Sequence, residues 1–457
     1  MPPKPVNSEL KNFWKLGNEE LNTQYFDITR GGDLMIKEGN YQYNVVELIK
    51  KYGSPLEIVV PSIIESRLKN IIDYFNAYIK LLDYKGKFFY HYPMKVNQNK
   101  EYVLPLISEG ANLETSSANE LWIIKRLWEQ EKFNSKIRVL CNGPKTQKYL
   151  SLIDELDRKG VIISPVIEEE RELEFFKKYP GEVGIRVDLS VKVKSHWDKR
   201  FNHFGFPEEE LLKIGKIRNL AILHYHISSQ IESLDGITAP IKRAMYIYKK
   251  LKEKNPQLDT INIGGGAGVP YEKRKMYTTK SLINKVVKTF KSEADKLGIK
   301  HPNIICEWGR FAVAPAQVSI FKVISQKEIE GSTQAKAWYM LDGSFINDLK
   351  DTWAIKQKWH VTPANNLNDK KLKHVWLSGS SCDSDDIYTN GGHILMPKLE
   401  EGYDQYVAVF DTGAYQDSLA SHHCLLSSPA KIILHNGAVT VARKRESPEE
   451  VGKLFGW

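Results

Sequence analysis

The fold is decided by a strand, a helix and a second strand that follow one another between residues 220 and 266. The strands read Leu220-Ala221-Ile222-Leu223-His224-Tyr225-His226-Ile227 and Thr260-Ile261-Asn262-Ile263, and three glycines, Gly264-Gly265-Gly266, follow the second strand. Between the strands, residues 237–253 place apolar side chains at helical spacing. Strands that alternate with helices of this length indicate βαβ units and a parallel sheet.

The same alternation extends in both directions from this unit, over residues 62–318. A helical pattern at residues 63–82 precedes a β-rich run at residues 87–92, and further strands are expected at residues 137–141, 161–164, 183–189 and 303–307. Seven or eight such units over about 250 residues predict a closed (β/α)₈ TIM barrel, whose chemistry lies at the carboxyl ends of the strands. The predicted fold class is therefore α/β.

The helical alternation stops after residue 318, and a second domain is expected there. Short strands are predicted at residues 318–323, 337–341, 374–377, 406–410, 432–435 and 439–441. Residues 319–457 are therefore expected to form a C-terminal, mainly antiparallel β domain. We expect the strands of residues 26–61 to pair with this domain, and residues 1–25 to form an N-terminal arm.

The composition is that of a folded globular chain. Of the 457 residues, 42% are hydrophobic and 26% are charged, and 65 Lys and Arg against 56 Asp and Glu leave a net charge of +9. Basic residues are mixed with acids along helical faces, as in residues 249–254 and 291–296. Solvated helix faces explain this charge better than a nucleic-acid partner does.

The four cysteines and the hydropathy pattern bear on location and metal binding. Cys141, Cys306, Cys382 and Cys424 are too scattered for a disulfide framework, and no Cys/His spacing typical of a metal site occurs. Residues 1–9 have no apolar region that a secretory signal would need. No run of about 18 apolar residues exists to cross a membrane. A cytoplasmic protein is predicted.

Polar residues and glycines are concentrated where the predicted barrel strands end. Glycines 264–266 could bring backbone N–H groups close to a phosphate, or simply form a βα turn. Lys95 could be a Schiff-base lysine or a solvated cation. Glu307 and Arg310 could be functional or could form a structural ion pair. The residues alone thus favour a barrel enzyme with an anion site and a candidate amine nucleophile.

Several segments together resemble the biosynthetic arginine decarboxylases, which are relatives of diaminopimelate and ornithine decarboxylases. The segments occur in the family's order: Tyr92-Pro93-Met94-Lys95-Val96-Asn97-Gln98, Leu113-Glu114-Thr115-Ser116-Ser117-Ala118, Leu223-His224-Tyr225-His226-Ile227-Ser228-Ser229-Gln230, Asn262-Ile263-Gly264-Gly265-Gly266, Glu307-Trp308-Gly309-Arg310, Asp351-Thr352-Trp353-Ala354-Ile355, Ser381-Cys382-Asp383-Ser384-Asp385-Asp386 and Thr412-Gly413-Ala414-Tyr415-Gln416. The resemblance implies a fold-type III enzyme dependent on pyridoxal 5′-phosphate, with an alanine-racemase-like barrel and a β domain.

The resemblance also implies roles for individual residues around the cofactor. Lys95 would bind the cofactor covalently, and His226 would stack on its pyridine ring. Glu307 would keep the pyridine nitrogen protonated, which makes the ring an electron sink. Glu114 matches an acid near the ring. The remaining residues would bind the phosphate, and they are Ser229, Gly264, Gly265, Gly266, Gly309, Arg310 and Tyr415.

A second group of residues would act on the substrate. Cys382 matches a cysteine that reaches in from the partner subunit and helps to reprotonate the substrate, a task that suits a thiol. Asp383 would contact the distal cationic end of the substrate, with Asp385 and Asp351 as further candidates, whereas Asp386 is expected to be a solvated loop carboxylate. The resemblance thus implies a homodimer with shared active sites, and a higher oligomer is compatible with it.

The predicted reaction is the decarboxylation of L-arginine to agmatine and carbon dioxide, in polyamine biosynthesis. Ser228, Trp308 and the segment Arg200-Phe201-Asn202-His203 depart from the family pattern, so citrulline, ornithine, lysine or a larger carboxylate conjugate remain alternative substrates. An inactive regulator that resembles antizyme inhibitors is the alternative of another class. No motif indicates a magnesium site, although a magnesium requirement is compatible with the sequence.

Overall fold

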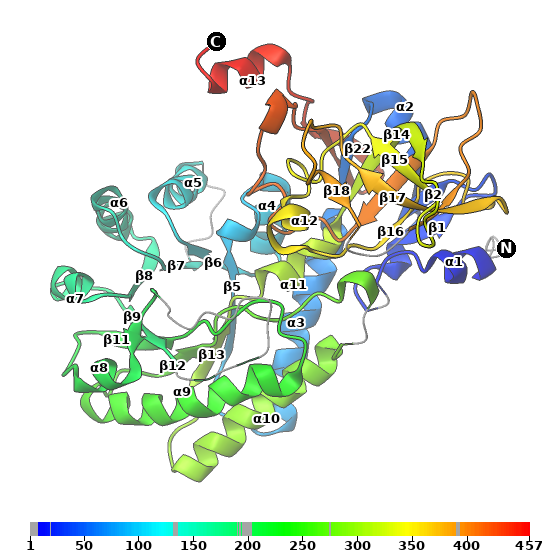
Figure 1. The fold of residues 1–457 in the computed structure, drawn as a ribbon. Helices are drawn as coiled ribbons and strands as arrows, with labels where there is room; N and C mark the ends of the chain where they lie inside the picture. The colour runs from blue at the N-terminus through cyan, green and yellow to red at the C-terminus, as the bar shows by residue number, and fades with distance from the viewer. Residues whose placement is uncertain are drawn as a thin grey trace.

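A barrel of eight parallel strands and a mixed β domain make up most of the chain (Figure 1). The computed structural model describes residues 8–18, 20–130, 136–189, 191, 193, 203–273, 276–389 and 394–457. Residues 1–7 of the predicted arm, and Arg200, Phe201 and Asn202 of the segment that departs from the family pattern, therefore lie outside the described residues.

The barrel closes through a continuous ring of parallel pairings. Its strands, in order around the ring, are β5 (Phe88–Pro93), β6 (Asn112–Thr115), β7 (Arg138–Cys141), β8 (Ile162–Ile167), β9 (Val183–Asp188), β11 (Leu220–His224), β12 (Thr260–Asn262) and β13 (Asn303–Cys306). The ring closes where Ile304 to Cys306 of β13 pair with Phe88 to Tyr90 of β5. This confirms the predicted closed barrel. A short strand, β10 (Phe206–Pro207), adds to the end of β9.

Amphipathic helices surround the barrel. They are α3 (Pro61–Leu81), α4 (Lys100–Ser108), α5 (Ala118–Glu129), α6 (Gln147–Arg158), α7 (Glu170–Phe176), α8 (Glu208–Lys213), α9 (Leu234–Lys254) and α10 (Thr279–Leu297). In α9, buried residues such as Ile237, Ile241, Ala244 and Tyr248 recur at helical spacing, so one face covers the sheet. A capping box between Thr278 and Ser281 begins α10.

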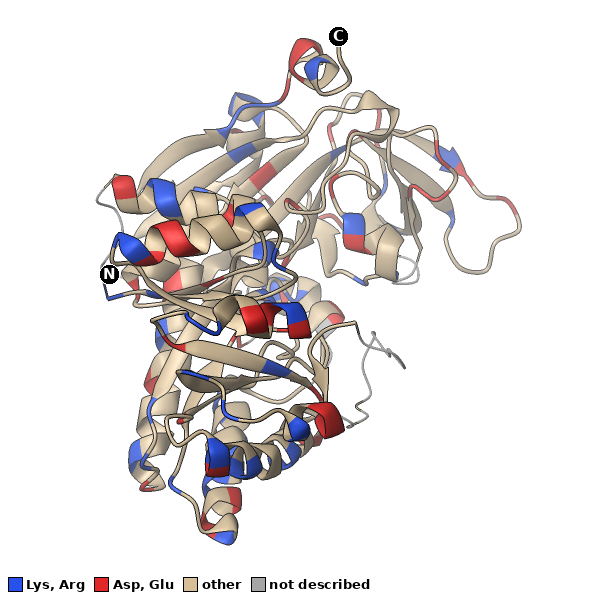
Figure 2. Ribbon diagram, turned by 90° about the vertical axis from the view of Figure 1, so that its left-hand side faces the viewer, with Lys and Arg blue, Asp and Glu red and all other residues tan. Residues whose placement is uncertain are grey.

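The outer faces of these helices carry mixed charges. Figure 2 shows basic and acidic residues interspersed along the helices, and α9 and α10 contain the pairs Lys250–Glu253 (3.5 Å) and Lys291–Asp295 (2.6 Å). Many basic side chains are therefore explained as partners of acidic side chains on the same helix surface. Within the described residues, none of the helices is both long and apolar enough to span a bilayer.

The β domain is built from both ends of the chain. One path through its sheet runs β18 (Ile387–Tyr388), β17 (Leu372–Ser378), β15 (Ala337–Leu341), β14 (Gln317–Glu328), β4 (Leu56–Val59), β21 (Ala430–His435) and β22 (Ala438–Arg443). Three further strands pair beside this path: β16 (Val361–Pro363), β19 (Ile394–Pro397) and β20 (Tyr406–Phe410). Most pairings are antiparallel, but β15 with β17 and β4 with β21 are parallel, so the sheet is mixed.

The described part of the predicted N-terminal arm contains a short helix that contacts the β domain. Residues Ser8–Trp14 form α1, and the buried Trp14 indole donates a hydrogen bond to the Leu367 carbonyl at 2.7 Å. Of the strands expected in residues 26–61, only β4 joins the large sheet. The other three, β1 (Phe26–Ile28), β2 (Leu34–Glu38) and β3 (Tyr41–Asn44), form a separate antiparallel sheet, followed by α2 (Val45–Tyr52).

Candidate active site

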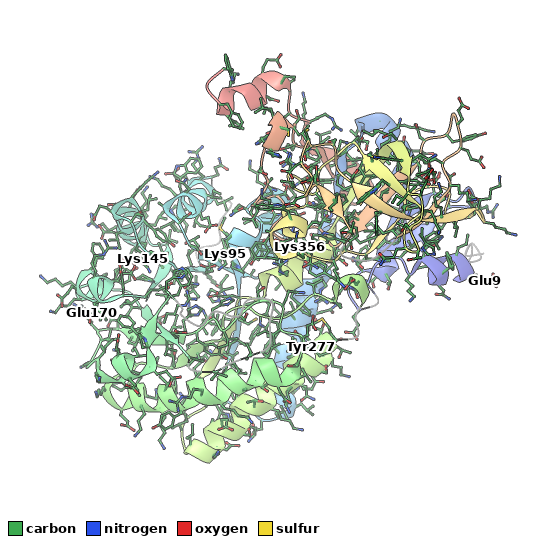
Figure 3. The ribbon with its side chains drawn as sticks, viewed as in Figure 1. Glu9, Lys95, Lys145, Glu170, Tyr277 and Lys356 are labelled. Atoms are coloured by element: carbon green, nitrogen blue, oxygen red, sulfur yellow. The ribbon has the colours of Figure 1, made fainter. Side chains whose placement is uncertain are left out.

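A small cavity lies at the carboxyl ends of the barrel strands, next to the β domain. It contains Lys95, which Figure 3 places near the middle of the molecule. Its walls are Pro93, Lys95, His226, Ser229, Gly265, Gly266, Ala267, Glu307, Trp308, Gly309, Arg310 and Tyr415. The predicted cofactor residues therefore come together, with Gly264 directly beside the cavity and Glu114 acting on Lys95 electrostatically.

The local sequence explains how Lys95 enters this cavity. Strand β5 is rich in aromatic residues, which favour strands, and it ends at Pro93, which has no N–H to donate to a ladder. A single 3₁₀ turn, Met94–Val96, follows and carries Lys95. The protein surrounds Lys95 on most sides, yet its side chain stays accessible because it projects into the open cavity.

The charges around the cavity keep Lys95 protonated. Burial lowers the pKa of Lys95, but the carboxylates of Glu114 and Glu307 and the hydroxyl of Tyr415 outweigh burial and the repulsion from Arg186, so the pKa is raised. A lysine must lose its proton before it can attack a carbonyl group. The site therefore favours the charged form of the amine, which must pass its proton to an acceptor before it can react.

Glu307 follows β13 and is fixed by two asparagines from other strands. Its Oε1 accepts hydrogen bonds from the amides of Asn262 (2.7 Å) and Asn142 (3.2 Å), and Nδ1 of His224 lies 3.9 Å away. Burial and the positive charge of Arg186 lower the pKa of His224 to about 3, so its ring is neutral. These contacts hold the Glu307 carboxylate in place at the wall of the cavity.

Glu114, at the end of β6, is a buried carboxyl with a strongly shifted pKa. Burial, together with the negative charge of Glu307, raises its pKa to about 8, although Lys95 opposes the shift. Its Oε1 accepts a hydrogen bond from the Ser116 hydroxyl at 2.8 Å, whereas none of the described residues donates a hydrogen bond to its buried Oε2. Glu114 is thus able to hold a proton near neutral pH.

Arg310 provides the positive end of the cavity and is held by three neighbours. Its Nη1 donates to Oδ2 of Asp351 at 3.0 Å and to the hydroxyl of Tyr271 at 3.3 Å, and its guanidinium lies 4.4 Å from the ring centre of Tyr415. Arg310 and Asp351 are both buried. Asp351, expected as a residue that binds the substrate, therefore contacts the arginine of the predicted phosphate site.

The glycine turn after β12 makes close contact with His226. The Gly265 amide donates to Nδ1 of His226 at 3.1 Å, so this nitrogen acts as an acceptor. A Cβ atom at Gly265 would lie 3.1 Å from Cε1 of His226, and Gly266 has a positive φ of 118°. Glycine at these positions keeps the backbone close to the ring and leaves room for a ligand beside it.

Cys382, Asp383 and Asp385 lie on a loop of the β domain and do not line the Lys95 cavity. Cys382 is exposed, and Asp383 forms an ion pair with Nε2 of His423 at 3.2 Å. The backbone N–H of the exposed Asp385 donates to Oδ1 of Asp383 at 2.9 Å. Within one chain, the structure therefore does not bring these residues together with Lys95.

The expectation that Asp386 is a solvated loop carboxylate is wrong. Asp386 is 1% exposed. Its Oδ1 accepts a hydrogen bond from the backbone N–H of Phe345 at 2.7 Å, and its Oδ2 accepts the Ser381 hydroxyl at 2.5 Å. A buried carboxylate is stable only when it is well hydrogen-bonded, and here it shapes the loop that carries Cys382.

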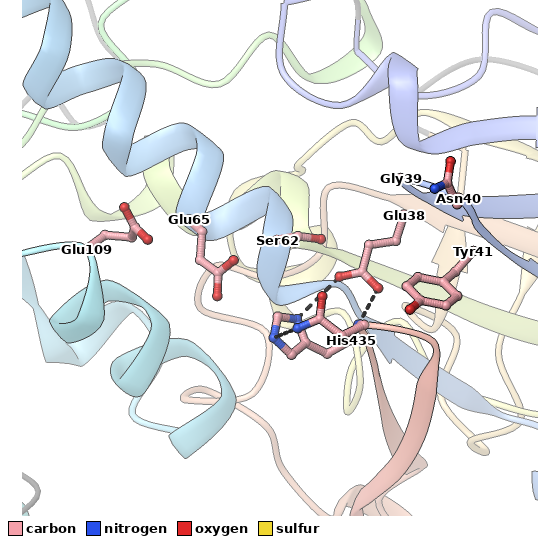
Figure 4. A pocket seen from close by; sticks show the side chains of 9 residues that line it. Glu38, Gly39, Asn40, Tyr41, Ser62, Glu65, Glu109 and His435 are labelled. Atoms are coloured by element: carbon pink, nitrogen blue, oxygen red, sulfur yellow. Dashed lines mark hydrogen bonds and ion pairs between the residues drawn. The ribbon is translucent and has the colours of Figure 1, made fainter.

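A second, more open pocket lies apart from the Lys95 cavity and contains none of the residues assigned to chemistry (Figure 4). Glu38, Glu65 and Glu109 line it together with His435. Glu38 pairs with Nδ1 of His435 at 3.3 Å and accepts the Asn436 N–H at 2.6 Å. The Lys95 cavity is the stronger candidate because an amine, a guanidinium and a fixed carboxylate converge there. Among the residues that the structure describes, no three His, Cys, Asp or Glu side chains gather as ligands for a metal ion.

Three site residues, Arg186, His224 and Asn262, were missed as candidates from the sequence, whereas Asn142 was among the polar residues expected at the strand ends. Asn142 directly follows a predicted strand, so its position gave a usable signal. Arg186, His224 and Asn262 lie inside strands. Polar residues within otherwise apolar barrel strands were the signal that could have identified them.

The comparisons with known proteins agree with this geometry. The pyridoxal-binding domain of pyridoxal-dependent decarboxylases matches residues 68–314. A biosynthetic arginine decarboxylase of Bacteroides thetaiotaomicron is 24% identical over 88% of this chain and 84% of its own. A diaminopimelate decarboxylase of Methanocaldococcus jannaschii is 27% identical over 90% of this chain and 94% of its own.

Solved structures show the same fold. The biosynthetic arginine decarboxylase of Campylobacter jejuni superposes with a TM-score of 0.80 at 21% identity, covering 95% of this chain and 89% of the other. The diaminopimelate decarboxylase of M. jannaschii gives a TM-score of 0.80 at 23% identity, covering 94% and 96%. Since the domain match spans more than half of the chain, this protein belongs to the pyridoxal-dependent decarboxylase family.

Proposed function

We propose that this protein is a pyridoxal-phosphate-dependent decarboxylase that converts L-arginine to agmatine and carbon dioxide, in the cytoplasm and in polyamine biosynthesis. The observation that carries the proposal is the convergence of Lys95, Glu307 and Arg310 on one cavity in a chain of this family. Relatives named biosynthetic arginine decarboxylase match most of the chain and support the choice of substrate.

The chemistry of the cavity fits pyridoxal phosphate. The cofactor has an aldehyde, a phosphate and a basic ring nitrogen, and the cavity offers an amine, a guanidinium and a carboxylate. Lys95 would bind the aldehyde, and Glu307 would hold the ring nitrogen. Gly264, Gly265, Gly266, Gly309, Ser229, Arg310 and Tyr415 would hold the phosphate. When bound, the cofactor supplies an electron sink for the electrons released as carbon dioxide leaves.

The chain's own residues prepare this chemistry. Asn142 and Asn262 fix Glu307, so its carboxylate keeps one orientation. His226, held by the Gly265 amide, presents its ring to the cavity. Glu114, with a pKa of about 8, can take up or release a proton near neutral pH, and its ionised form raises the pKa of Lys95. The neutral His224 keeps a second positive charge away from Glu307.

A homodimer with shared active sites would complete the machinery. Cys382 and Asp383 are accessible on the surface of one chain rather than in its own cavity, which suits residues that serve the partner's cavity. Cys382 would return a proton to the substrate carbon, and Asp383 would bind the distal cationic group. Asp385 is a further candidate on the same loop, and Asp351 is a weaker one because Arg310 already engages it.

The charge of this loop favours a substrate with a cationic end. Residues 379–389 contain three aspartates and no lysine or arginine. A guanidinium is matched by carboxylates, whereas the second carboxylate of diaminopimelate would need a cation. Diaminopimelate decarboxylation is still the second candidate, because the match to the M. jannaschii relative covers 90% of this chain. Citrulline, ornithine, lysine and larger conjugates are further alternatives.

The test is carbon dioxide release by the purified, cofactor-loaded protein with arginine, citrulline, ornithine, lysine and diaminopimelate in parallel. Release from arginine alone, with agmatine as product, supports the proposal. Release of carbon dioxide from another amino acid of the panel would change the proposed substrate and leave the proposed decarboxylation reaction unchanged. If the cofactor binds Lys95 and none of the five reacts, the substrate is a larger conjugate or the chain is a regulator. If the cofactor does not bind, the proposal fails.

A further inference from the structure

The turn that carries Lys95 is bound by a loop of the β domain. The loop, residues 413–418, follows β20 and runs beside the end of β5. The Tyr415 N–H donates to the Val96 carbonyl at 2.8 Å, and the Ser418 hydroxyl reaches the same carbonyl at 3.4 Å. The residue after Lys95 is therefore fixed by a domain that does not belong to the barrel.

Asn97 makes a second connection between the same two segments. Its side-chain amide donates to the Gly413 carbonyl at 3.0 Å and to Oδ2 of Asp417 at 2.9 Å. Its Oδ1 accepts the Asn99 N–H at 3.1 Å, and its side chain is fully buried. Because both amide protons are directed at the loop, Asn97 has little freedom to adopt another arrangement without leaving buried groups unpaired.

The loop itself is firmly anchored. The Gly413 N–H donates to the Ala314 carbonyl at 3.0 Å, and a Cβ atom at Gly413 would overlap the Val313 carbonyl. Oδ1 of Asp417 pairs with the buried Lys431 and, at 3.3 Å, with Arg443. The loop is therefore a rigid support, and Asn97 transmits its position to the lysine turn.

The same loop also forms part of the anion end of the cavity. Tyr415 lines the cavity, has a left-handed backbone with φ of 69°, and packs its ring 4.4 Å from the Arg310 guanidinium. Such a backbone conformation costs energy in a non-glycine residue and persists only where the surroundings enforce it. One loop thus touches both the lysine turn and the arginine of the cavity.

We propose that Asn97 is a positioning residue that sets the separation between the Lys95 amine and the anion-binding end formed by Arg310 and Tyr415. The inference rests on the proposed binding of pyridoxal phosphate. That ligand carries its aldehyde and its short phosphate arm on adjacent carbons of one flat ring, so the two groups reach both ends together only when the separation of those ends falls within the ligand's narrow range. If the separation of the two ends no longer fits the ligand, each contact can still form alone. The ligand then loses the extra affinity that comes from making both contacts at once.

The test compares pyridoxal phosphate with pyridoxal, which lacks the phosphate. Asn97→Ala should weaken binding of pyridoxal phosphate by about tenfold or more, and it should change binding of pyridoxal by less than about threefold. Binding is followed by visible absorbance and by the mass of the borohydride-reduced protein. The matched control is Asn99→Ala, two residues away, because the Asn99 side chain does not cap α4. The control should bind both ligands as the wild type does.

Three outcomes would overturn the inference. Unchanged binding of pyridoxal phosphate means that Asn97 does not position the turn. An equal loss for both ligands means that it acts on Lys95 alone, and an equal loss in the control means a general effect on α4. If Asn97→Ala shows no cooperative unfolding transition, Asn97→Ser is measured by the same criteria. Failure of the wild type to bind either ligand would instead reject the proposed function.

Discussion

Replacing Glu114 with glutamine should change how the stability of the cofactor-free protein depends on pH. The pKa of Glu114 is raised from 4.5 to about 8 by burial and by Glu307. Between these values the folded protein holds a proton that the unfolded chain has released, so stability falls as the pH rises. Each pH unit in this window costs about 1.4 kcal/mol. Between pH 5 and pH 8 the wild type should therefore lose up to about 4 kcal/mol relative to Glu114→Gln.

The assay is urea unfolding of both proteins at pH 5, 6, 7 and 8. Glutamine resembles the protonated carboxyl but cannot ionise, so any loss of contacts appears as a constant offset and only the slope reports the titration. Glu401→Gln, which removes an exposed carboxylate, is the control and should follow the wild type. Parallel curves for the wild type and Glu114→Gln would refute the reasoning, because Glu114 would then ionise equally in both states.

Three further predictions follow from the packing. Lys431→Met should lower the free energy of unfolding by about 3–5 kcal/mol in urea titrations, since it leaves Glu57 and Asp417 buried without their main cation; an unchanged midpoint would contradict this. Gly309→Ala should weaken binding of pyridoxal phosphate about tenfold in absorbance titrations, because the new Cβ would lie 2.6 Å from Cγ2 of Val96. Unaltered affinity would show that the turn carrying Val96 can move to make room for the new methyl group. Cys382→Ser should reduce carbon dioxide release by about tenfold or more and leave cofactor binding intact, because the thiol is exposed and outside the cavity; near-normal turnover would remove its proposed role.

The regular parts of the fold were predictable because their residues follow simple periods. The helix predicted at residues 237–253 corresponds to α9, Leu234–Lys254, and the strand at residues 337–341 to β15, Ala337–Leu341. The helix α4 and the strand β6 were not predicted. Pro105 interrupts the helical pattern of α4, and β6 has only four residues, of which Asn112, Glu114 and Thr115 are polar. Short, polar barrel strands gain their stability from neighbouring strands, which a local pattern cannot reveal.

The convergence of the proposed cofactor residues on one cavity was predictable for a related reason. In a barrel, polar residues at the ends of successive strands must gather at one rim, so Lys95, Glu307 and Arg310 could be assigned to one site. The partners of the acids could not be assigned in this way. Asp351 pairs with Arg310, and Asp386 binds backbone N–H groups of the segment around Phe345. Both contacts depend on how distant loops pack, which neither spacing nor composition encodes.

The position of β4 has a consequence for the order in which the protein matures. This strand is made before the barrel, yet it pairs with β14 on one side and with β21, near the end of the chain, on the other. During synthesis the barrel can therefore form before β21 has been made, when β4 still lacks this pairing partner. The loop that supports Lys95 and carries Tyr415 also emerges late. The nascent chain should thus be unable to capture its cofactor until nearly the whole sequence has left the ribosome.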